Sequence, residues 1–140
     1  DGCRTPMVWE SGAPNAGFST AKPWLPVPAE QKAQAVDVQA GHAGSLLEHY
    51  RAFLDFRRAH SVFAKGDIEF LAGDDDVLVF TRDHGNERIV FAFNLGSRNA
   101  SLDLGDEATL HAVDGHGFTS STEGGKINLG AYGAWFGRLA

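Results

Sequence analysis

A chain of 140 residues, 43% hydrophobic and 21% charged, has the size and composition of about one soluble globular domain. Its net charge of −6 makes a nucleic-acid backbone an unfavourable partner, and no run approaches the roughly 18 apolar residues of a membrane span. The single cysteine, Cys3, excludes an internal disulfide, argues against a thiolate zinc site and favours a reducing compartment. We therefore expect a cytoplasmic location.

The first 28 residues, DGCRTPMVWESGAPNAGFSTAKPWLPVP, lack helical or strand periodicity and contain all five prolines of the chain. Because proline fixes φ, such a loop loses less entropy when it becomes ordered, so we expect a functional loop with a defined position. Trp9, Phe18 and Trp24 are expected to be its apolar anchor. The chain begins with neither an initiator methionine nor a leader-type apolar run, which predicts a large segment upstream.

Residues 29–44 are polar and small. Only Val36 and Val38 alternate with polar neighbours, and this alternation predicts a short extended piece. The loop is therefore expected to continue to residue 44.

A helix is predicted over about residues 45–60. Ser45 and Glu48 match the S-x-x-E capping box, in which each side chain accepts a bond from a backbone donor at the helix start. Apolar residues then recur at three- and four-residue spacing in a single stripe: Leu46, Leu47, Tyr50, Phe53 and Leu54. The stripe predicts one helix face that is buried against the segment expected upstream.

From Ser61 the period of the apolar residues changes from about 3.6 to 2. The strongest pair of strands is VLVFTRDHGNERIVFAFNLG, which alternates on both sides of a tight polar turn. Seven short strands are predicted, at 68–71, 77–82, 88–94, 100–104, 109–113, 126–129 and 134–139. Strands at roughly ten-residue spacing predict a small antiparallel sandwich. A lone helix with a long irregular lead-in is, by contrast, typical of the end of a larger α/β unit.

Three motifs in the opening loop carry a resemblance to a known family. They are DGCRTPMVW at residues 1–9, NAGFS at 15–19 and KPWLPV at 22–27. In order and spacing they closely resemble the α-glucosidase and oligo-1,6-glucosidase branch of the α-amylase superfamily, whose pattern reads approximately R-D-x-x-R-T-P-M-x-W, x-A-G-F-[ST] and P-W-[LI]-x-V. The helix LLEHYRAFLDFRRAH resembles the family's last barrel helix, and the strands resemble its C-terminal β domain.

This resemblance implies a mixed fold in two parts. Residues 1–62 would be the C-terminal end of a (β/α)8 TIM barrel, with a loop over 1–44 and the last helix at about 45–60. Residues 63–140 would be a small antiparallel β-sandwich domain. The family's nucleophilic Asp, acid/base Glu and transition-state-stabilising Asp lie upstream, so no catalytic residue is expected in this chain. The implied partners are the missing barrel of the same protein and a small α-glucoside. No cofactor is expected, and a structural metal ion upstream stays open.

Arg4 is the one position to which the resemblance carries a functional role. The family pattern has a sugar-binding Arg immediately before Asp1, outside this chain, and Arg4 matches the second Arg of the motif. A planar, permanently charged guanidinium suits both vicinal sugar hydroxyls and a carboxylate. Two compatible roles stay open for Arg4, namely direct sugar contact and an ion pair that braces the loop.

Other motifs favour structural roles. The acidic run 74–76 lies in a predicted hairpin turn, which favours solvated side chains over a calcium site. Cys3 is expected to be a buried thiol, Glu10 a surface residue, and Trp9 and Trp24 packing anchors more than sugar-stacking rings. The six histidines show no H-E-x-x-H spacing, so no metal site is predicted.

The leading hypothesis is therefore the C-terminal part of a retaining exo-acting α-glucosidase, which hydrolyses small α-glucosides or transfers their glucose. One alternative is a non-catalytic carbohydrate-binding or structural β module. The predicted strands offer little for binding, since Trp135 is their only tryptophan and Phe80, Phe91 and Phe93 alternate as core residues. Another alternative is a sibling activity, such as sucrose isomerisation or trehalose synthesis.

Overall fold

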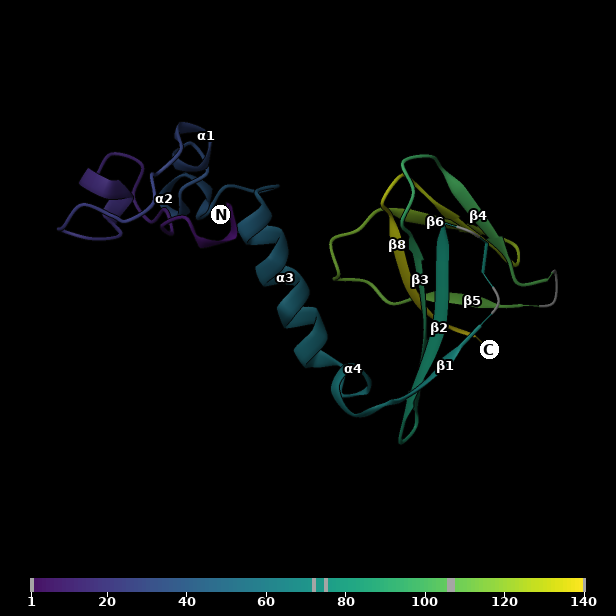
Figure 1. Cartoon of the computed structure of the whole chain (residues 1–140). Helices are drawn as coiled ribbons and strands as arrows, with labels where there is room; N and C mark the ends of the chain where they lie inside the picture. Colours follow the sequence, from purple (N-terminus) through teal and green to yellow (C-terminus); the bar gives the residue numbers. More distant parts are fainter. Residues whose placement is uncertain (1, 72, 75, 106–107, 140) are drawn as a thin grey trace. The chain divides into compact units, whose positions relative to one another are not determined.

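The computed structural model describes residues 2–71, 73–74, 76–105 and 108–139 (Figure 1). The chain forms two compact units, residues 1–51 and 52–140, and the boundary between them in the sequence falls inside the long helix α3, Leu46–Ala59. None of the described helices is long and apolar enough to cross a membrane. The domain division predicted at residues 62 and 63 concerns the parent protein and stays a prediction.

The first unit contains several short helical turns, whereas a loop without helices was predicted there. They are η1 at Gly2–Arg4, η2 at Pro14–Gly17, α1 at Ala29–Lys32 and α2 at Val36–Gln39. The extended piece predicted around residue 36 is wrong, because those residues form α2. The N–H groups of Val36 and Asp37 donate to the carbonyls of Val8 and Trp9, at 3.1 and 3.0 Å, and the N–H of Ala40 closes the helical turn on the carbonyl of Val36 at 2.8 Å.

Small aliphatic residues form the core of the first unit. Val8, Ala16 and Ala35 are buried, and Val27 packs against them. The predicted aromatic anchor is wrong, because Trp9, Phe18 and Trp24 are 50%, 49% and 79% exposed. The backbone bonds that join residues 8–10, 16 and 36–37 bring these segments so close that only small side chains fit between them.

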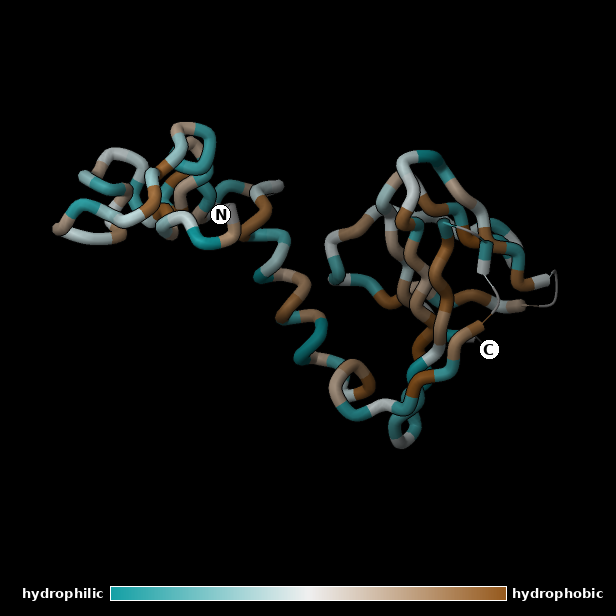
Figure 2. Tube along the Cα trace, viewed as in Figure 1, coloured by the Kyte–Doolittle hydropathy of each residue, from teal (hydrophilic) through white to brown (hydrophobic). Residues whose placement is uncertain are grey.

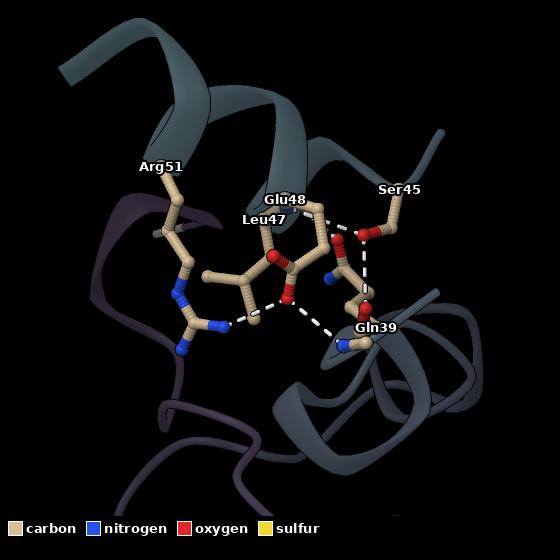
Figure 3. A network of polar contacts seen from close by, with 6 residues as sticks. Gln39, Ser45, Leu47, Glu48 and Arg51 are labelled. Carbon is tan, nitrogen blue, oxygen red and sulfur yellow. Dashed lines mark hydrogen bonds and ion pairs between the residues drawn. The ribbon is translucent and has the colours of Figure 1, made fainter. Parts of the chain in front are cut away.

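Helix α3 begins with a network of side-chain caps that differs from the predicted capping box (Figure 3). The Ser45 hydroxyl accepts from the N–H of Glu48 at 3.3 Å, as predicted. The Glu48 carboxylate, however, accepts from the N–H of Gly41 at 2.9 Å and from Arg51 at 2.7 Å. The Gln39 Oε1 accepts a hydrogen bond from the backbone N–H of Leu47 at 3.1 Å. The helix start is therefore tied to the turn that precedes it, and the backbone bond from Gly41 is the main reason why the pKa of Glu48 is lowered.

Antiparallel strands build the second unit, as predicted, in two sheets. One sheet has the order β1-β2-β3-β8-β5 and the other the order β4-β7-β6. The strands are β1 Asp67–Phe70, β2 Val77–His84, β3 Glu87–Asn94, β4 Ala100–Asp103, β5 Leu110–Ala112, β6 Ser120–Glu123, β7 Lys126–Leu129 and β8 Ala134–Leu139. The predicted strong pair is the β2–β3 hairpin, in register from Val77 opposite Asn94 to His84 opposite Glu87.

Two elements of this unit, β6 and α4, were not predicted. Strand β6 consists of Ser120–Glu123, four polar residues without apolar alternation. The short helix α4, Val62–Lys65, contains Val62 and Phe63, which are both buried. Its single turn is too short to show a helical period in the sequence.

The five-stranded sheet is buried on both faces of its central strands. Along β3, Val90 and Ala92 face a core that is shared with Ile127 and Leu129 of the smaller sheet. The intervening residues of β3, together with Phe136 of β8, belong to a second core on the opposite face. Figure 2 shows the apolar character of these strands and the polar turns between them. The predicted small antiparallel sandwich is confirmed, and its larger sheet carries a helical layer in addition.

Helix α3 contributes its last turns to this second core. Phe53 and Phe56 lie 6.0 and 5.3 Å, between ring centroids, from Phe136. The predicted stripe included Phe53 but missed Phe56, which is the one buried residue of α3. The stripe residues Leu46 and Tyr50 are 73% and 60% exposed. Within this chain the buried face of α3 is therefore aromatic and lies near its C-terminus, and burial of the stripe against the missing barrel stays a prediction.

Glu87 interacts with His60 and Arg138 at one end of this helical layer. The Glu87 carboxylate of β3 lies 2.8 Å from His60 Nδ1 and 3.0 Å from the Arg138 guanidinium of β8. Partial burial raises the pKa of Glu87, but the bonds to His60 and Arg138 outweigh it and leave the pKa below its ordinary value.

We expect Gly137→Ala to destabilise the second unit by about 1–3 kcal/mol, because of overpacking. A Cβ at Gly137 would overlap Cζ2 and Cη2 of the buried Trp135 and lie 2.7 Å from the carbonyl oxygen of His111. Urea unfolding of the purified chain measures this loss. Gly130→Ala is the matched control, because a Cβ there meets nothing within 4 Å. Equal midpoints for the two variants would contradict the packing described here.

Candidate functional site

The three motifs of the opening loop fold onto one another in the first unit. The carbonyl oxygen of Ala16, in the second motif, accepts the N–H groups of Trp9 and Glu10 at 2.9 and 3.1 Å. Val27, at the end of the third motif, packs on the core formed by Val8, Ala16 and Ala35. Segments that are separate in the sequence thus form a single folded body, which we call the motif unit (residues 2–37).

Two residues of the second motif adopt left-handed backbone conformations. Asn15 and Ala16 have φ of 49° and 53°, a region that costs a residue with a Cβ about 1–2 kcal/mol. Local bonds hold the turn in place, since Asn15 Nδ2 donates to the carbonyls of Ser19 and Ala21 at 2.9 and 3.1 Å. Left-handed residues that are over-determined in this way cluster at functional sites.

A carboxylate joins the loop to helix α2. Asp37 accepts the backbone N–H of Ser11 with both carboxylate oxygens at 3.0 Å, and the Ser11 hydroxyl at 2.9 Å. The backbone N–H of Ser11 is the main reason why the pKa of Asp37 lies below its ordinary value of 3.8. This Ser11–Asp37 clamp fixes the loop between the first and second motifs.

Arg4, the predicted site residue, lies in η1 and is exposed. Its guanidinium carbon is 5.2 Å from the centroid of the Trp24 ring, which is cation–π geometry. The structure thus brings the first and third motifs together at this pair. A guanidinium stacked on an aromatic face still presents N–H donors along its edge, in the plane that suits vicinal hydroxyls or a carboxylate.

A shallow pocket of about 300 Å³ lies in the same unit. It is lined by residues of the second and third motifs and by one lysine of α1: Asn15, Ala16, Lys22, Pro23, Leu25, Pro26, Val27 and Lys32. Two lysines and two prolines make it a rigid, positively charged surface. The motif unit therefore offers cations and an exposed aromatic ring, and the lining of this pocket contains none of the paired carboxyl groups that glycoside hydrolysis needs.

The other predicted residues that the structure describes are exposed. Glu10 is exposed, as expected, and Asp74 is exposed in the turn before β2, whereas Asp75 lies outside the described residues, as does Asp1. The predicted burial of Cys3 is wrong, because its thiol is exposed in η1 and is not part of the small core of the first unit. Among the described residues, no three His, Cys, Asp or Glu side chains are grouped so as to hold a metal ion.

Two features of this site were not predicted. The first is the Trp24 ring as partner of Arg4, a pairing across 20 positions that no local pattern signals. The second is the Ser11–Asp37 clamp, which spans 26 positions. The asparagine at the start of the second motif was a usable signal for the turn, because Asn tolerates the left-handed region better than most residues.

We expect the motif unit to loosen in acid through Asp37. Because the folded-state pKa of Asp37 is lowered, the stabilisation is fully present above the ordinary value of 3.8 and is lost as the pH falls through the lower folded value. Hydrogen exchange of the Ser11 amide between pH 5 and pH 2.5 measures the loss, and Asp37→Asn is expected to remove this pH dependence. Asp55→Asn, on the exposed face of α3, is the control. A Ser11 amide whose protection is unchanged by Asp37→Asn would contradict the clamp.

Comparison with known families identifies the motif unit and the helices that follow it. The model of the α-amylase catalytic domain matches residues 1–66. This stretch contains the three motifs, Arg4, the Ser11–Asp37 clamp, α3 and α4. The β strands all lie beyond it.

Relatives extend the match over both units. A probable α-glucosidase of Rhizobium meliloti (strain 1021) is 47% identical over all 140 residues, which make up 25% of that protein. An oligo-1,6-glucosidase of Heyndrickxia coagulans is 34% identical over 108 residues, or 76% of this chain and 19% of that protein. The chain thus spans about a quarter of the length of the first relative and about a fifth of the second.

Solved structures agree with this assignment. The crystal structure of the α-glucosyl transfer enzyme XgtA matches 98% of this chain with a TM-score of 0.89 at 37% identity, and the match covers 25% of that enzyme. The trehalulose synthase MutB matches 98% of this chain with a TM-score of 0.82 at 22% identity, a likeness of fold alone. The fold is thus the C-terminal end of a (β/α)8 barrel followed by an antiparallel sandwich. The chain therefore belongs to the α-amylase superfamily, as a C-terminal segment of its α-glucosidase and oligo-1,6-glucosidase branch.

Proposed function

We propose that this chain is the C-terminal part of a retaining α-glucosidase that acts on small α-glucosides by hydrolysis or glucosyl transfer. The observation that carries the proposal is the folding of all three family motifs into one body, with Arg4 held over Trp24. Relatives that match 140 and 108 residues of this chain are named probable α-glucosidase and oligo-1,6-glucosidase. Arg4 would bind the sugar or brace the pocket, and the second unit would stabilise the barrel.

The described carboxyl groups favour catalytic acids elsewhere in the protein. A retaining glycosidase needs a nucleophile and a general acid about 5–5.5 Å apart, and the acid needs a raised pKa. Four described carboxyl groups have a displaced pKa, those of Asp37, Glu48, Glu87 and Asp103, and each is lowered. Each also bonds to a backbone N–H or a basic side chain, as structural carboxylates do.

The test compares this chain with the full-length protein on p-nitrophenyl α-D-glucoside. We expect the full-length protein to hydrolyse it and to release glucose first as the α-anomer, which proton NMR of the fresh product detects. We expect the 140-residue chain alone to be inactive. Hydrolysis by the isolated chain, or initial release of the β-anomer by the full-length protein, would overturn the proposal.

We further propose that the protein is cytoplasmic. The support is the exposed thiol of Cys3, the one cysteine of the chain, which a reducing compartment keeps from oxidation. Fractionation of the source cells, followed by detection with an antibody, tests the location. Recovery of the protein from the medium would contradict it.

A further inference from the structure

On one face of the larger sheet, the helical layer covers only part of the strands. The neighbouring strands β1, β2 and β3 (Figure 1) align a row of aromatic residues there, because Phe70 pairs with Phe80 and Phe80 pairs with Phe91. Phe91 is buried against Phe63 of α4, with ring centroids 4.8 Å apart, whereas Phe70 is 66% exposed. The cover over this face therefore ends between β3 and β1.

A second row on the same face is also open. Leu78 precedes Phe80 by two positions on β2, so their side chains lie on one face. Leu78 is 37% exposed, and it pairs with Phe93 of β3, which is half-buried. The Phe80 ring lies 5.8 Å from that of Phe70 and 5.9 Å from that of Phe93, between centroids. We call these four residues, Phe70, Leu78, Phe80 and Phe93, the open face.

The open face has the properties of an interaction surface. Its four side chains belong to three adjacent strands and contain no polar atom. Single exposed apolar residues are normal in proteins, but a contiguous apolar surface marks a site where another apolar surface docks. Because contact with water is unfavourable for these rings, the fitting partner is apolar as well.

The cover that is present on this face comes from the catalytic domain. The model of that domain matches residues 1–66 and so includes both α3 and α4. Phe56 of α3 and Phe63 of α4 form one core with Phe91 of the sheet. The Arg82 guanidinium of β2 also donates to the carbonyl oxygen of Phe63, at 2.6 Å. The catalytic domain thus already packs on this face, and the open face continues the same interface.

One further helix suffices to cover the open face. Neighbouring strands lie about 4.8 Å apart, and a helix with its side chains is about 10–12 Å wide, so β1 and β2 fit beneath a single helix. The helices of a (β/α)8 barrel form an outer ring, in which the last helix has other helices as neighbours. This chain covers 25% of the Rhizobium relative and of XgtA, so there is room upstream for those helices.

We propose that the open face is the docking surface for an apolar stripe on a second helix of the catalytic barrel of the same protein. This inference rests on the part of the proposed function that places a barrel upstream, and it is independent of the substrate. Docking at this face would hold the sandwich in one position against the barrel, in addition to the covalent connection through α3 and α4.

The test compares thiol labelling in the full-length protein and in the 140-residue chain. Phe70→Cys and, separately, Leu78→Cys place a thiol on the open face. Glu69→Cys is the matched control, because Glu69 is exposed on the same strand as Phe70 and alternates to the opposite face. Peptide mass spectrometry follows N-ethylmaleimide at each position and separates it from label on the exposed Cys3. We expect both open-face thiols to react at the control's rate in the 140-residue chain, and at least about tenfold more slowly in the full-length protein.

Open-face thiols that react at the control's rate in the full-length protein would overturn the inference. Equal slowing of all three thiols would overturn it too, because it would indicate cover along the edge of β1. Slowing that disappears on dilution would assign the face to a second copy of the protein.

Activity of the unsubstituted full-length protein on p-nitrophenyl α-D-glucoside is measured separately, because labelling requires no substrate. Slow labelling together with an inactive protein would support the docking surface and overturn only the proposed function. Rapid labelling together with an active protein would overturn only the docking surface.

Discussion

Arg4→Ala in the full-length protein is expected to lower kcat/KM for p-nitrophenyl α-D-glucoside about 10- to 100-fold. Hydrogen bonds of a charged donor are worth about 1.5–3 kcal/mol, and each 1.4 kcal/mol is tenfold in rate. Arg4→Lys keeps the charge but loses the planar fork and the stacking on Trp24, so it should restore only part of the rate. Steady-state kinetics of the three proteins measures the effect.

Trp24→Leu tests whether the Trp24 ring positions the Arg4 guanidinium. If the ring holds the guanidinium in place, Trp24→Leu reproduces part of the Arg4→Ala loss, and the double variant loses less than the sum of the single losses. Arg58→Ala is the control, because that side chain is 73% exposed in a helical ion pair with Asp55. An Arg4→Ala protein as active as the Arg58→Ala protein would refute a role for Arg4 in the pocket.

Phe136→Ala is expected to destabilise the second unit by about 3–5 kcal/mol, the range for removing a fully buried aromatic ring. Phe136 is 0% exposed and lies at the centre of the core beneath α3 and α4. Its ring centroid is 5.3 Å from that of Phe56, 5.4 Å from Phe91 and 5.9 Å from Phe63. Because rings of β3, α3 and α4 contact it, the cavity can collapse only if several elements shift together.

Urea unfolding, followed by far-UV circular dichroism, measures this loss. Phe70→Ala is the matched control, because Phe70 lies on the edge strand β1 and is 66% exposed. It should change the free energy of unfolding by less than about 0.5 kcal/mol. If both variants lost the same free energy, the ring cluster around Phe136 would not be the core of this unit.

The sheet was predictable where the sequence of a strand, by itself, indicates a strand. Residues 77–80 and 89–93 are apolar without interruption, as strands with a core on each face are, and the β2–β3 hairpin follows from these two runs and the polar turn between them. Strand β6 was not predictable, because its Ser and Thr residues do not alternate with apolar ones. Helix α3 was predictable from its cap and spacing, whereas its buried face was not. Which apolar residues of a helix are buried depends on the partner surface. The contact between Phe56 and Phe136 joins residues far apart in the sequence, so no local pattern indicates it.

Only one residue of the candidate site, Arg4, was predictable. Arg4 was identified through the resemblance, but its position over Trp24 depends on the fold of residues 5–23. The aromatic residues of the loop were expected inside because large apolar rings usually are. The backbone bonds of Ala16 and Val36 instead bring the segments too close for them, and alanine and valine fill the space.

The proposed function requires that this chain shapes a glucoside pocket whose catalytic carboxylates lie elsewhere in the protein. The most direct measurement traps the covalent glucosyl-enzyme intermediate of the full-length protein with a fluorinated α-glucosyl fluoride and locates the modified residue by peptide mass spectrometry. We predict one glucosylated carboxylate outside the 140 residues of this chain. Glucosylation of an Asp or Glu within them would contradict the account.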